Sequence, residues 1–189
     1  AYPEDFRGFV MIDITEFVRM SIKEVVVTLF LTFSLVVLVC YVFLQDWRAT
    51  LIPTVAIPVS LLSTFIVLAG FGYSINLLTL FALVLVIGTV VDNAIVVVER
   101  VIHVMEFEGL DQRAATVKAM RDISGAMVAS TLVLLAIFVP IAFMGGMSGR
   151  IYRQFAVSCS AAVTFSLLVA LTLSPALCAT LLRIPKPVK

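Results

Sequence analysis

Charge is scarce in this sequence: Asp, Glu, Lys and Arg together make up 13% of its 189 residues, against roughly 25% in soluble domains. Hydrophobic residues make up 62%, a composition that is poorly suited to a protein surrounded by water. The net charge is only +1, and no basic cluster with interleaved aromatic residues occurs, which argues against a nucleic-acid partner. The sequence therefore predicts a protein embedded in a lipid bilayer.

Side chains that bind metals or perform nucleophilic catalysis are also few. His103 is the only histidine. Cys40, Cys159 and Cys178 stand singly in apolar stretches, without the short paired spacing of structural zinc sites. We expect the cysteines to pack as small apolar residues and His103 to lie at the surface. No serine, histidine and aspartate set for hydrolysis is recognisable, so the sequence predicts neither an enzyme nor a metal site and implies no cofactor.

Five apolar stretches are long enough to cross a bilayer, because about 30 Å of hydrocarbon requires roughly 20 residues at 1.5 Å of rise per residue. They are residues 25–44, 51–71, 77–98, 124–144 and 155–182. Four prolines, expected to bend these helices without breaking them, lie within or near the ends of the stretches, at Pro53, Pro58, Pro140 and Pro175. The predicted fold class is an all-α membrane protein, a bundle of about five transmembrane helices.

The segments around the spans have patterns of their own. Residues 1–24, before the bundle of residues 25–182, are predicted to form a periplasmic lead-in and an interfacial helix, because their later part shows helical spacing of apolar side chains. Residues 183–189 are predicted to form a cytoplasmic tail. Between the third and fourth spans, Gly109 can adopt the left-handed conformation that ends a helix, and Asp111 can cap the next one. We expect a helical hairpin there.

The connections between the spans alternate between charged and nearly charge-free segments, which predicts a topology by the positive-inside rule. Residues 45–50, 99–122 and 183–189 hold eight of the thirteen Lys and Arg residues, namely Arg48, Arg100, Arg113, Lys118, Arg121, Arg183, Lys186 and Lys189. We therefore expect the amino terminus on the periplasmic side and the carboxyl terminus in the cytoplasm. An odd number of spans is consistent with this arrangement.

Asp92 lies well inside an apolar span, whereas the other eleven of the twelve Asp and Glu residues fall in connections or at span edges. It precedes Val98 by six residues, which places it about 9 Å from the cytoplasmic end of its span. An Asp at the helix centre costs about 2.5–3.5 kcal/mol on insertion scales, and such residues typically mark ion or proton pathways. We interpret Asp92 as a proton carrier. The alternative is that it only forms hydrogen bonds with a neighbouring helix.

Three neighbours of Asp92 complete the candidate site. Asn93 cannot titrate, so interhelical hydrogen bonding is its expected role beside the proton carrier. Gly88 and Thr89 lie about one helical turn before Asp92, and their small side chains would let another helix approach closely. The candidate proton relay is therefore Asp92 with Asn93, and Gly88 and Thr89 are predicted to be helix-packing residues beside it.

The segment around Asp92 resembles a known motif. Residues 88–99, Gly-Thr-Val-Val-Asp-Asn-Ala-Ile-Val-Val-Val-Glu, are similar to the fourth-helix motif of resistance-nodulation-division exporters. Further motifs follow in the order of that family's second to sixth helices, at residues 43–53, 71–76, 138–146, 151–155 and 174–179. The resemblance covers about residues 14–185, and it favours the branch that exports hydrophobic and amphiphilic compounds over the heavy-metal branch.

The resemblance implies that the chain holds helices two to six of a twelve-helix transporter subunit. Such pumps work as homotrimers in a bacterial inner membrane, use the proton motive force, and pass drugs through a periplasmic region to an adaptor protein and an outer-membrane channel. They usually carry two adjacent acids on the fourth helix, paired with a lysine on the tenth. Asp92 matches the first acid, and Asn93 stands where the second acid is usual. The implied function is drug/proton antiport, with the remaining half of the transporter and the lipid bilayer as further partners.

Two other functions are compatible with the same residues. One is a membrane scaffold fragment with no transport of its own. The other is a relative of these pumps that uses the same helices to move lipids, proteins or metal ions. Sequence beyond both ends of the chain would distinguish them, because a drug/proton antiporter of this family needs a second set of about six spans and two long periplasmic segments.

Overall fold

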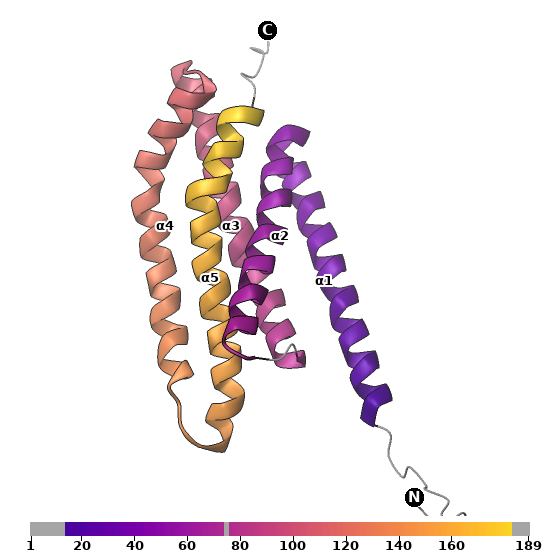
Figure 1. Cartoon of the computed structure of the whole chain (residues 1–189). Coiled ribbons are helices and arrows are strands. Elements are labelled where there is room, and N and C mark those ends of the chain that lie inside the picture. Colours follow the sequence, from indigo (N-terminus) through magenta and orange to yellow (C-terminus); the bar gives the residue numbers. More distant parts are fainter. Residues whose placement is uncertain (1–13, 74–75, 183–189) are drawn as a thin grey trace, which may run out of the picture.

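Figure 1 shows the computed structural model of the chain, which describes residues 14–73 and 76–182. This part of the chain forms five helices and no strand: α1 (Ile14–Leu44), α2 (Trp47–Gly70), α3 (Leu77–Glu108), α4 (Gln112–Ala142) and α5 (Gly146–Leu181). Each helix contains a stretch that is long and apolar enough to cross a membrane. The predicted all-α bundle is confirmed, whereas residues 1–13 of the predicted lead-in and the tail at residues 183–189 lie outside the described residues.

The helices extend beyond the apolar stretches of the sequence. α1 runs without a break from Ile14, so the predicted interfacial segment continues directly into the first span. α3 continues past Val98 to Glu108, and α4 begins at Gln112, well before the apolar stretch that starts at Ser124. The ends of these helices are therefore set by local start and stop signals and not by the hydrocarbon thickness alone.

Both ends of α3 and the start of α4 show such signals clearly. At the start of α3, the side chains of Asn76 and Thr79 form a capping box, in which each accepts a hydrogen bond from the backbone N–H of the other. Gly109 ends α3 in the left-handed conformation, with a φ of 65°. The carboxylate of Asp111 then accepts a 3.2 Å hydrogen bond from the backbone N–H of Ala114 at the start of α4. The helical hairpin predicted at Gly109 and Asp111 is confirmed.

Prolines occur inside three of the helices without interrupting them. Pro53 and Pro58 lie inside α2, Pro140 inside α4 and Pro175 inside α5, and each helix continues on both sides of its prolines. A proline removes one backbone donor, which a helix in a bilayer tolerates when neighbouring groups satisfy the freed carbonyl. The prediction of unbroken helices is confirmed.

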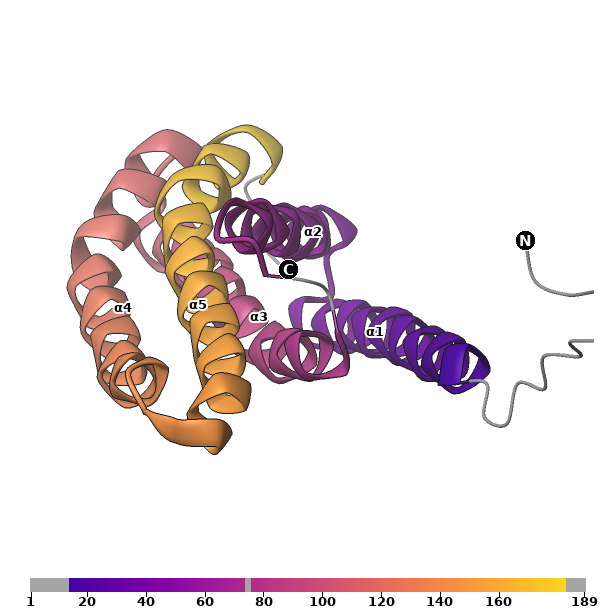
Figure 2. The ribbon, with the colours of Figure 1, turned by 60° about the horizontal axis from the view of Figure 1, so that its bottom comes forward.

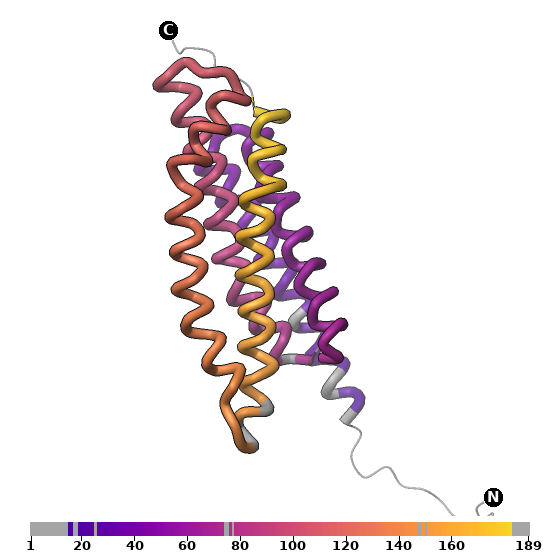
Figure 3. Tube along the Cα trace, turned by 60° about the vertical axis from the view of Figure 1, so that its left-hand side comes forward, coloured from indigo at the N-terminus to yellow at the C-terminus, as the bar shows by residue number. Residues whose placement is uncertain are grey.

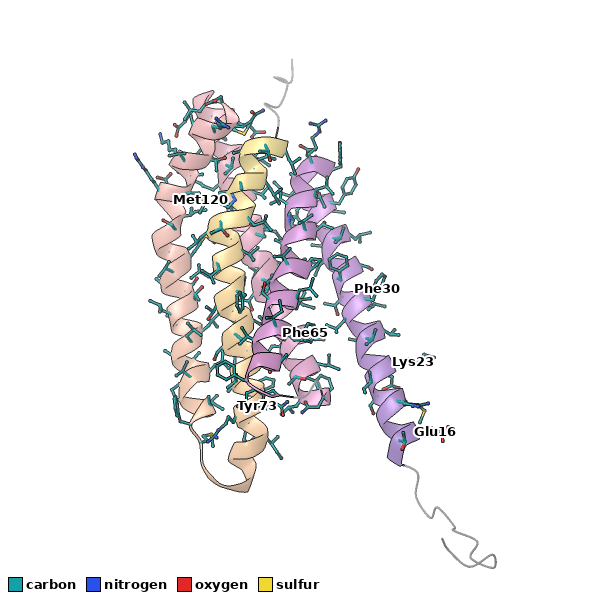
Figure 4. The ribbon with its side chains drawn as sticks, viewed as in Figure 1. Glu16, Lys23, Phe30, Phe65, Tyr73 and Met120 are labelled. Carbon is teal, nitrogen blue, oxygen red and sulfur yellow. The ribbon has the colours of Figure 1, made fainter. Side chains whose placement is uncertain are left out.

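α5 packs against α2, α3 and α4, whereas α1 contacts only α2 and α3 (Figure 2). Phe30 on α1 is 73% exposed and points away from the other helices (Figure 4). Small residues line the buried face of α5: Ala156, Ser158, Cys159, Ala162, Ser166, Ala170, Ser174 and Cys178. Small residues allow helix backbones to approach closely, and the resulting van der Waals contacts favour helix association in lipid. All three cysteines of the chain are buried and free, in agreement with their predicted packing role.

The connections alternate between the two ends of the bundle, as Figures 1 and 3 show. The α1–α2 turn, the α3–α4 hairpin and the end of α5 lie at one end, which we call the hairpin end. The α2–α3 and α4–α5 connections lie at the opposite end. The two connections predicted to be cytoplasmic, at residues 45–50 and 99–122, are therefore on the same side of the bundle.

Candidate functional site

One face of α3 is left uncovered by the described residues, because α1 and α4 flank α3 without contacting each other. The exposed residues recur every three or four positions: Phe81, Leu85, Gly88, Asp92, Val96, Glu99 and His103. This spacing keeps them on one side of the helix, and we call them the open face of α3. The packed face lies on the other side, and the residues on it that are at most 2% exposed include Val90, Ala94, Val97, Val98 and Val101.

Asp92 occupies the middle of the open face, where a cleft of about 690 Å³ separates α3 from α4. The polar residues that line this cleft come from both helices: Thr89, Asp92 and Asn93 from α3, and Ser130 and Thr131 from α4. Asp92 is exposed, and it forms no hydrogen bond or ion pair with the described residues. The described residues thus place an acid in the middle of an apolar helix without supplying its partner.

The described cations near the hairpin end are engaged with other acids or lie beyond the span of Asp92. Arg100 Nη2 lies 2.5 Å from Asp122 Oδ2, and Lys118 Nζ lies 2.5 Å from Glu108 Oε2. Both ion pairs join α3 to α4 outside the predicted hydrocarbon region. These ion pairs stabilise the hairpin, and no described cation forms an ion pair with Asp92.

Asn93 makes the interhelical contact that its amide was predicted to make. Its Nδ2 donates a 2.9 Å hydrogen bond to Oγ of Ser166 on α5. Ser166 is 1% exposed and Asn93 is half-buried, so this partly buried bond joins α3 to α5. Asp92 and Asn93 both line the cleft, but Asn93 is bonded to α5, whereas Asp92 has no partner among the described residues.

Gly88 and Thr89 do not mediate a close approach of helices within the described part of the chain. A Cβ atom added to Gly88 would meet nothing within 4 Å, and Thr89 is half-buried at the edge of the cleft beside Asp92. Their predicted packing role therefore requires a helix other than the four helices described beside α3, and it stays a prediction.

Sequence reasoning missed Ser166 and the hydroxyls of α4 that line the cleft. Ser158, Ser166 and Ser174 recur every eight residues along α5, which is slightly more than two helical turns, so each serine is rotated by about 80° from the one before. The three buried serines therefore follow a gradual spiral around α5, which packs against three other helices. This spacing does not single out Ser166 from the other two serines, because the choice depends on the height of Asn93 on α3.

His103 lies at the hairpin end of the open face, about three helical turns beyond Asp92. It is exposed, and its ring stacks on Phe107 with 4.4 Å between the ring centroids. This exposure agrees with the surface role predicted for the only histidine of the chain.

Comparison with known proteins relates the whole chain to one family. The model of the AcrB/AcrD/AcrF family matches residues 1–189. The multidrug export protein AcrF of Escherichia coli (strain K12) is 55% identical over 182 residues, which are 96% of this chain and 18% of AcrF. The solvent-resistant pump membrane transporter SrpB of Pseudomonas putida is 53% identical over 174 residues, 92% of this chain and 17% of SrpB. The multidrug/solvent efflux pump membrane transporter MepB of Pseudomonas putida is 50% identical over 182 residues, 96% of this chain and 17% of MepB.

The chain spans less than a fifth of the length of these relatives. The match nevertheless covers the entire sequence, including the segment around Asp92, and it agrees with the five membrane-crossing helices of the described residues. The resemblance to resistance-nodulation-division exporters of hydrophobic and amphiphilic compounds is thereby confirmed. The chain is a multi-pass membrane segment and belongs to the AcrB/AcrD/AcrF family.

Proposed function

We propose that this chain is the proton-conducting part of a secondary active transporter in a bacterial inner membrane, which exchanges protons for amphiphilic drugs or solvents. Asp92 is the proton carrier. The observation that carries the proposal is an acid in the middle of an apolar helix, exposed at a cleft and without a partner among the described residues. The names of the relatives, which include multidrug and solvent pumps, support the class of substrate.

The uncovered position of Asp92 implies a partner helix beyond the described bundle. An acid at the centre of a membrane helix costs about 2.5–3.5 kcal/mol on insertion scales and normally pairs or faces a bundle interior. A helix with a lysine, as the family resemblance implies, would offset this cost when seated against the open face. Gly88 and Thr89 would give that helix room to approach. Protonation of Asp92 would weaken its attraction to the lysine, and the two helices could then shift relative to each other.

Asn93 has a different role in this proposal. An amide does not titrate, so Asn93 carries no proton and instead keeps its side of α3 attached to α5 through Ser166. Asp92 can then form and break its contact with a partner helix on the open face while the packed face of α3 stays in place. The remaining transporter half, the homotrimer partners, a periplasmic adaptor and an outer-membrane channel are the proposed protein partners.

Replacement of Asp92 by Asn in the full-length transporter tests the proposal. The amide keeps the shape of the side chain but cannot release a proton, so drug export driven by a pH gradient in proteoliposomes should fall to background. Because Asp92 makes no contact that holds the described bundle together, membrane level and thermal stability should stay normal. Glu106→Gln is the matched control, since it removes an exposed acid from the same helix beyond the span. Full export by Asp92→Asn would refute the proton-carrier role.

We also propose that the hairpin end faces the cytoplasm, with the amino terminus on the periplasmic side. The distribution of Lys and Arg in the sequence supports this orientation. Phe107 and Phe143 are 75% and 79% exposed. Phe107 lies in the last turn of α3 and Phe143 directly follows α4, so they lie near opposite ends of the bundle. In intact cells without other reactive thiols, a membrane-impermeant thiol reagent should label Phe143→Cys and spare Phe107→Cys. The opposite pattern would invert the topology.

A further inference from the structure

The α3–α4 hairpin carries its charges unevenly. Residues 99–108 at the end of α3 hold three acids and one arginine, whereas residues 112–122 at the start of α4 hold three basic residues and one acid. The basic residues of α4 are Arg113, Lys118 and Arg121. The start of α4 therefore carries an excess of positive charge at the hairpin end of the bundle.

Ion pairing within the hairpin leaves part of this positive charge available. The single acid at the start of α4, Asp122, is paired with Arg100, and Lys118 is paired with Glu108. Arg113 and Arg121 form no ion pair and no hydrogen bond with the described residues. Two arginines thus remain without an acid although acids lie close to them in the sequence.

These arginines border a hollow on the outer side of α4. The hollow has a volume of about 580 Å³ and is lined by Arg113, Ala114, Val117, Lys118, Arg121 and Asp122. Val117 is 59% exposed, and it lies one helical turn from each arginine. The residues that α4 buries in this region, Ala115, Thr116 and Ala119, lie on its other side. The hollow therefore faces away from the described bundle.

The height of the hollow matches the surface of the bilayer. Arg121 precedes the apolar stretch at Ser124 by three residues, which is about 4.5 Å along the helix. Lys118 and Arg113 follow further out, and the long side chains of such residues bend toward the lipid headgroups. Headgroups occupy roughly 5–8 Å on each side of the hydrocarbon. Arg121 therefore lies at the level of the lipid phosphates, and Lys118, about 9 Å from Ser124, lies at the outer edge of that layer. Arg113 lies about 16 Å from Ser124, outside the headgroup layer, and its long side chain extends back toward the phosphates.

We propose that the outer side of α4 between Arg113 and Arg121 is a binding site for an anionic phospholipid. The guanidinium groups of the two arginines bind the phosphate oxygens, for which their planar donor arrangement is well suited. Ala114 and Val117, which are small and exposed, leave room for the headgroup between the two arginines. The site takes lipid, not soluble phosphate, because it lies beside the bilayer and continues into the apolar surface of α4. The proposal does not depend on proton transport by Asp92.

Quenching of a local fluorophore by brominated lipid tests this site. Val117→Cys, in a full-length transporter without other reactive thiols, carries the fluorophore in vesicles that contain either brominated phosphatidylglycerol or brominated phosphatidylcholine. Each cation near an anionic membrane surface increases association about fivefold. We therefore expect the anionic lipid to quench several-fold more effectively at equal mole fraction, and Arg113→Gln with Arg121→Gln to remove most of this preference.

Arg19→Gln with Lys23→Gln is the matched control, because it removes two exposed cations one helical turn apart on α1, remote from the hairpin end (Figure 4). This variant should keep the lipid preference at position 117. Equal quenching by both lipids would overturn the proposal, as would loss of the preference in millimolar inorganic phosphate at constant ionic strength. An absence of quenching by either lipid would show that protein, not lipid, covers this face of α4, and would overturn it too.

Discussion

The packed and open faces of α3 have similar apolar surroundings in the sequence but different contacts in the fold. On the packed face, Ala94 lies against Ala56 of α2 and Val169 of α5, and Asn93 donates its hydrogen bond to Ser166 nearby. On the open face, Asp92 lies in an exposed row between α1 and α4. Both faces of α3 consist mostly of apolar residues, so hydrophobicity alone does not distinguish the packed face from the open face. The two faces differ in the size of their side chains and in the presence of polar partners.

This difference assigns separate tasks to the two sides of one helix. The packed face holds the bundle together through small residues and one partly buried hydrogen bond. Substitutions on this face should therefore lower the stability of the bundle. The open face contributes little to the described bundle, so changes there should affect export while leaving the fold intact. Paired substitutions on the two faces can therefore test whether the faces have separate tasks.

The largest effect is expected from added bulk on the open face. A Cβ atom added at Gly88 meets no described atom within 4 Å, so for Gly88→Leu we expect normal insertion and normal stability. Export should nevertheless fall by more than about tenfold, because the leucine would keep a partner helix from seating beside Asp92. Transport assays in proteoliposomes measure this loss.

Gly125→Leu provides the matched control for Gly88→Leu. Gly125 is an exposed glycine inside α4 with nothing within 4 Å of an added Cβ, so the substitution makes the same change on α4, outside the row of residues that forms the open face of α3. Export should be nearly unaffected. If Gly88→Leu also exported at the normal rate, no helix would pack closely against the open face.

The next effect concerns stability and lies on the packed face. Ala94 is 1% exposed in contact with α2 and α5, so Ala94→Leu should overfill this contact and cost about 1–3 kcal/mol. Val96→Leu adds volume on the open face, where Val96 is 43% exposed, and should change little. Unfolding in mixed detergent micelles compares the two variants. If both variants were equally stable, the packed and open faces would not differ in their contribution to stability.

Much of this fold could be predicted from the sequence because lipid imposes strong rules. The length of apolar stretches locates the spans, and Gly109 and Asp111 mark the hairpin through backbone conformation and capping. The full lengths of α3 and α4 were missed for a physical reason. Beyond the hydrocarbon these helices continue on charged residues, and ion pairs between α3 and α4 support that extension.

The candidate site was predictable in part. Asp92 stands out because an acid inside a membrane helix is costly, and the hydrogen-bonding role of Asn93 follows from an amide that cannot titrate. The partner Ser166 and the open side of Asp92 depend on how α3 is rotated against α1, α4 and α5. Hydropathy carries no information about that rotation, since α1 is the most apolar of the described spans and also the least buried.

A smaller effect is expected from the hydrogen bond between Asn93 and Ser166. Ser166→Ala removes the acceptor, and hydrogen bonds between membrane helices contribute about 0.6 kcal/mol on average. We expect a loss of stability of that order, with export reduced less than by Gly88→Leu. Thr164→Ala is the control, because its hydroxyl bonds only to the backbone of Ser160 in the same helix. A stability equal to that of the parent protein would mean that Asn93 finds another acceptor.

The smallest effect is expected from substitution of the solvent-exposed acids at the hairpin end. Asp122 is paired with Arg100 at the hairpin end, with about a third of each side chain exposed, and such exposed pairs contribute about 0.2–1 kcal/mol. Asp122→Asn should therefore cost less than about 1 kcal/mol at low salt and still less at high salt, because mobile ions screen the pair. Glu106→Gln, which removes an exposed acid that has no ion pair among the described residues, should cause no measurable loss of stability.

Export should survive both Asp122→Asn and Glu106→Gln, since neither acid lies within the span. The same replacement of acid by amide would then abolish export at position 92 without affecting stability, and slightly affect stability at position 122 without affecting export. A loss of export by Asp122→Asn comparable to that of Asp92→Asn would mean that the hairpin takes part in proton transfer, and the functional acids could no longer be confined to the open face of α3.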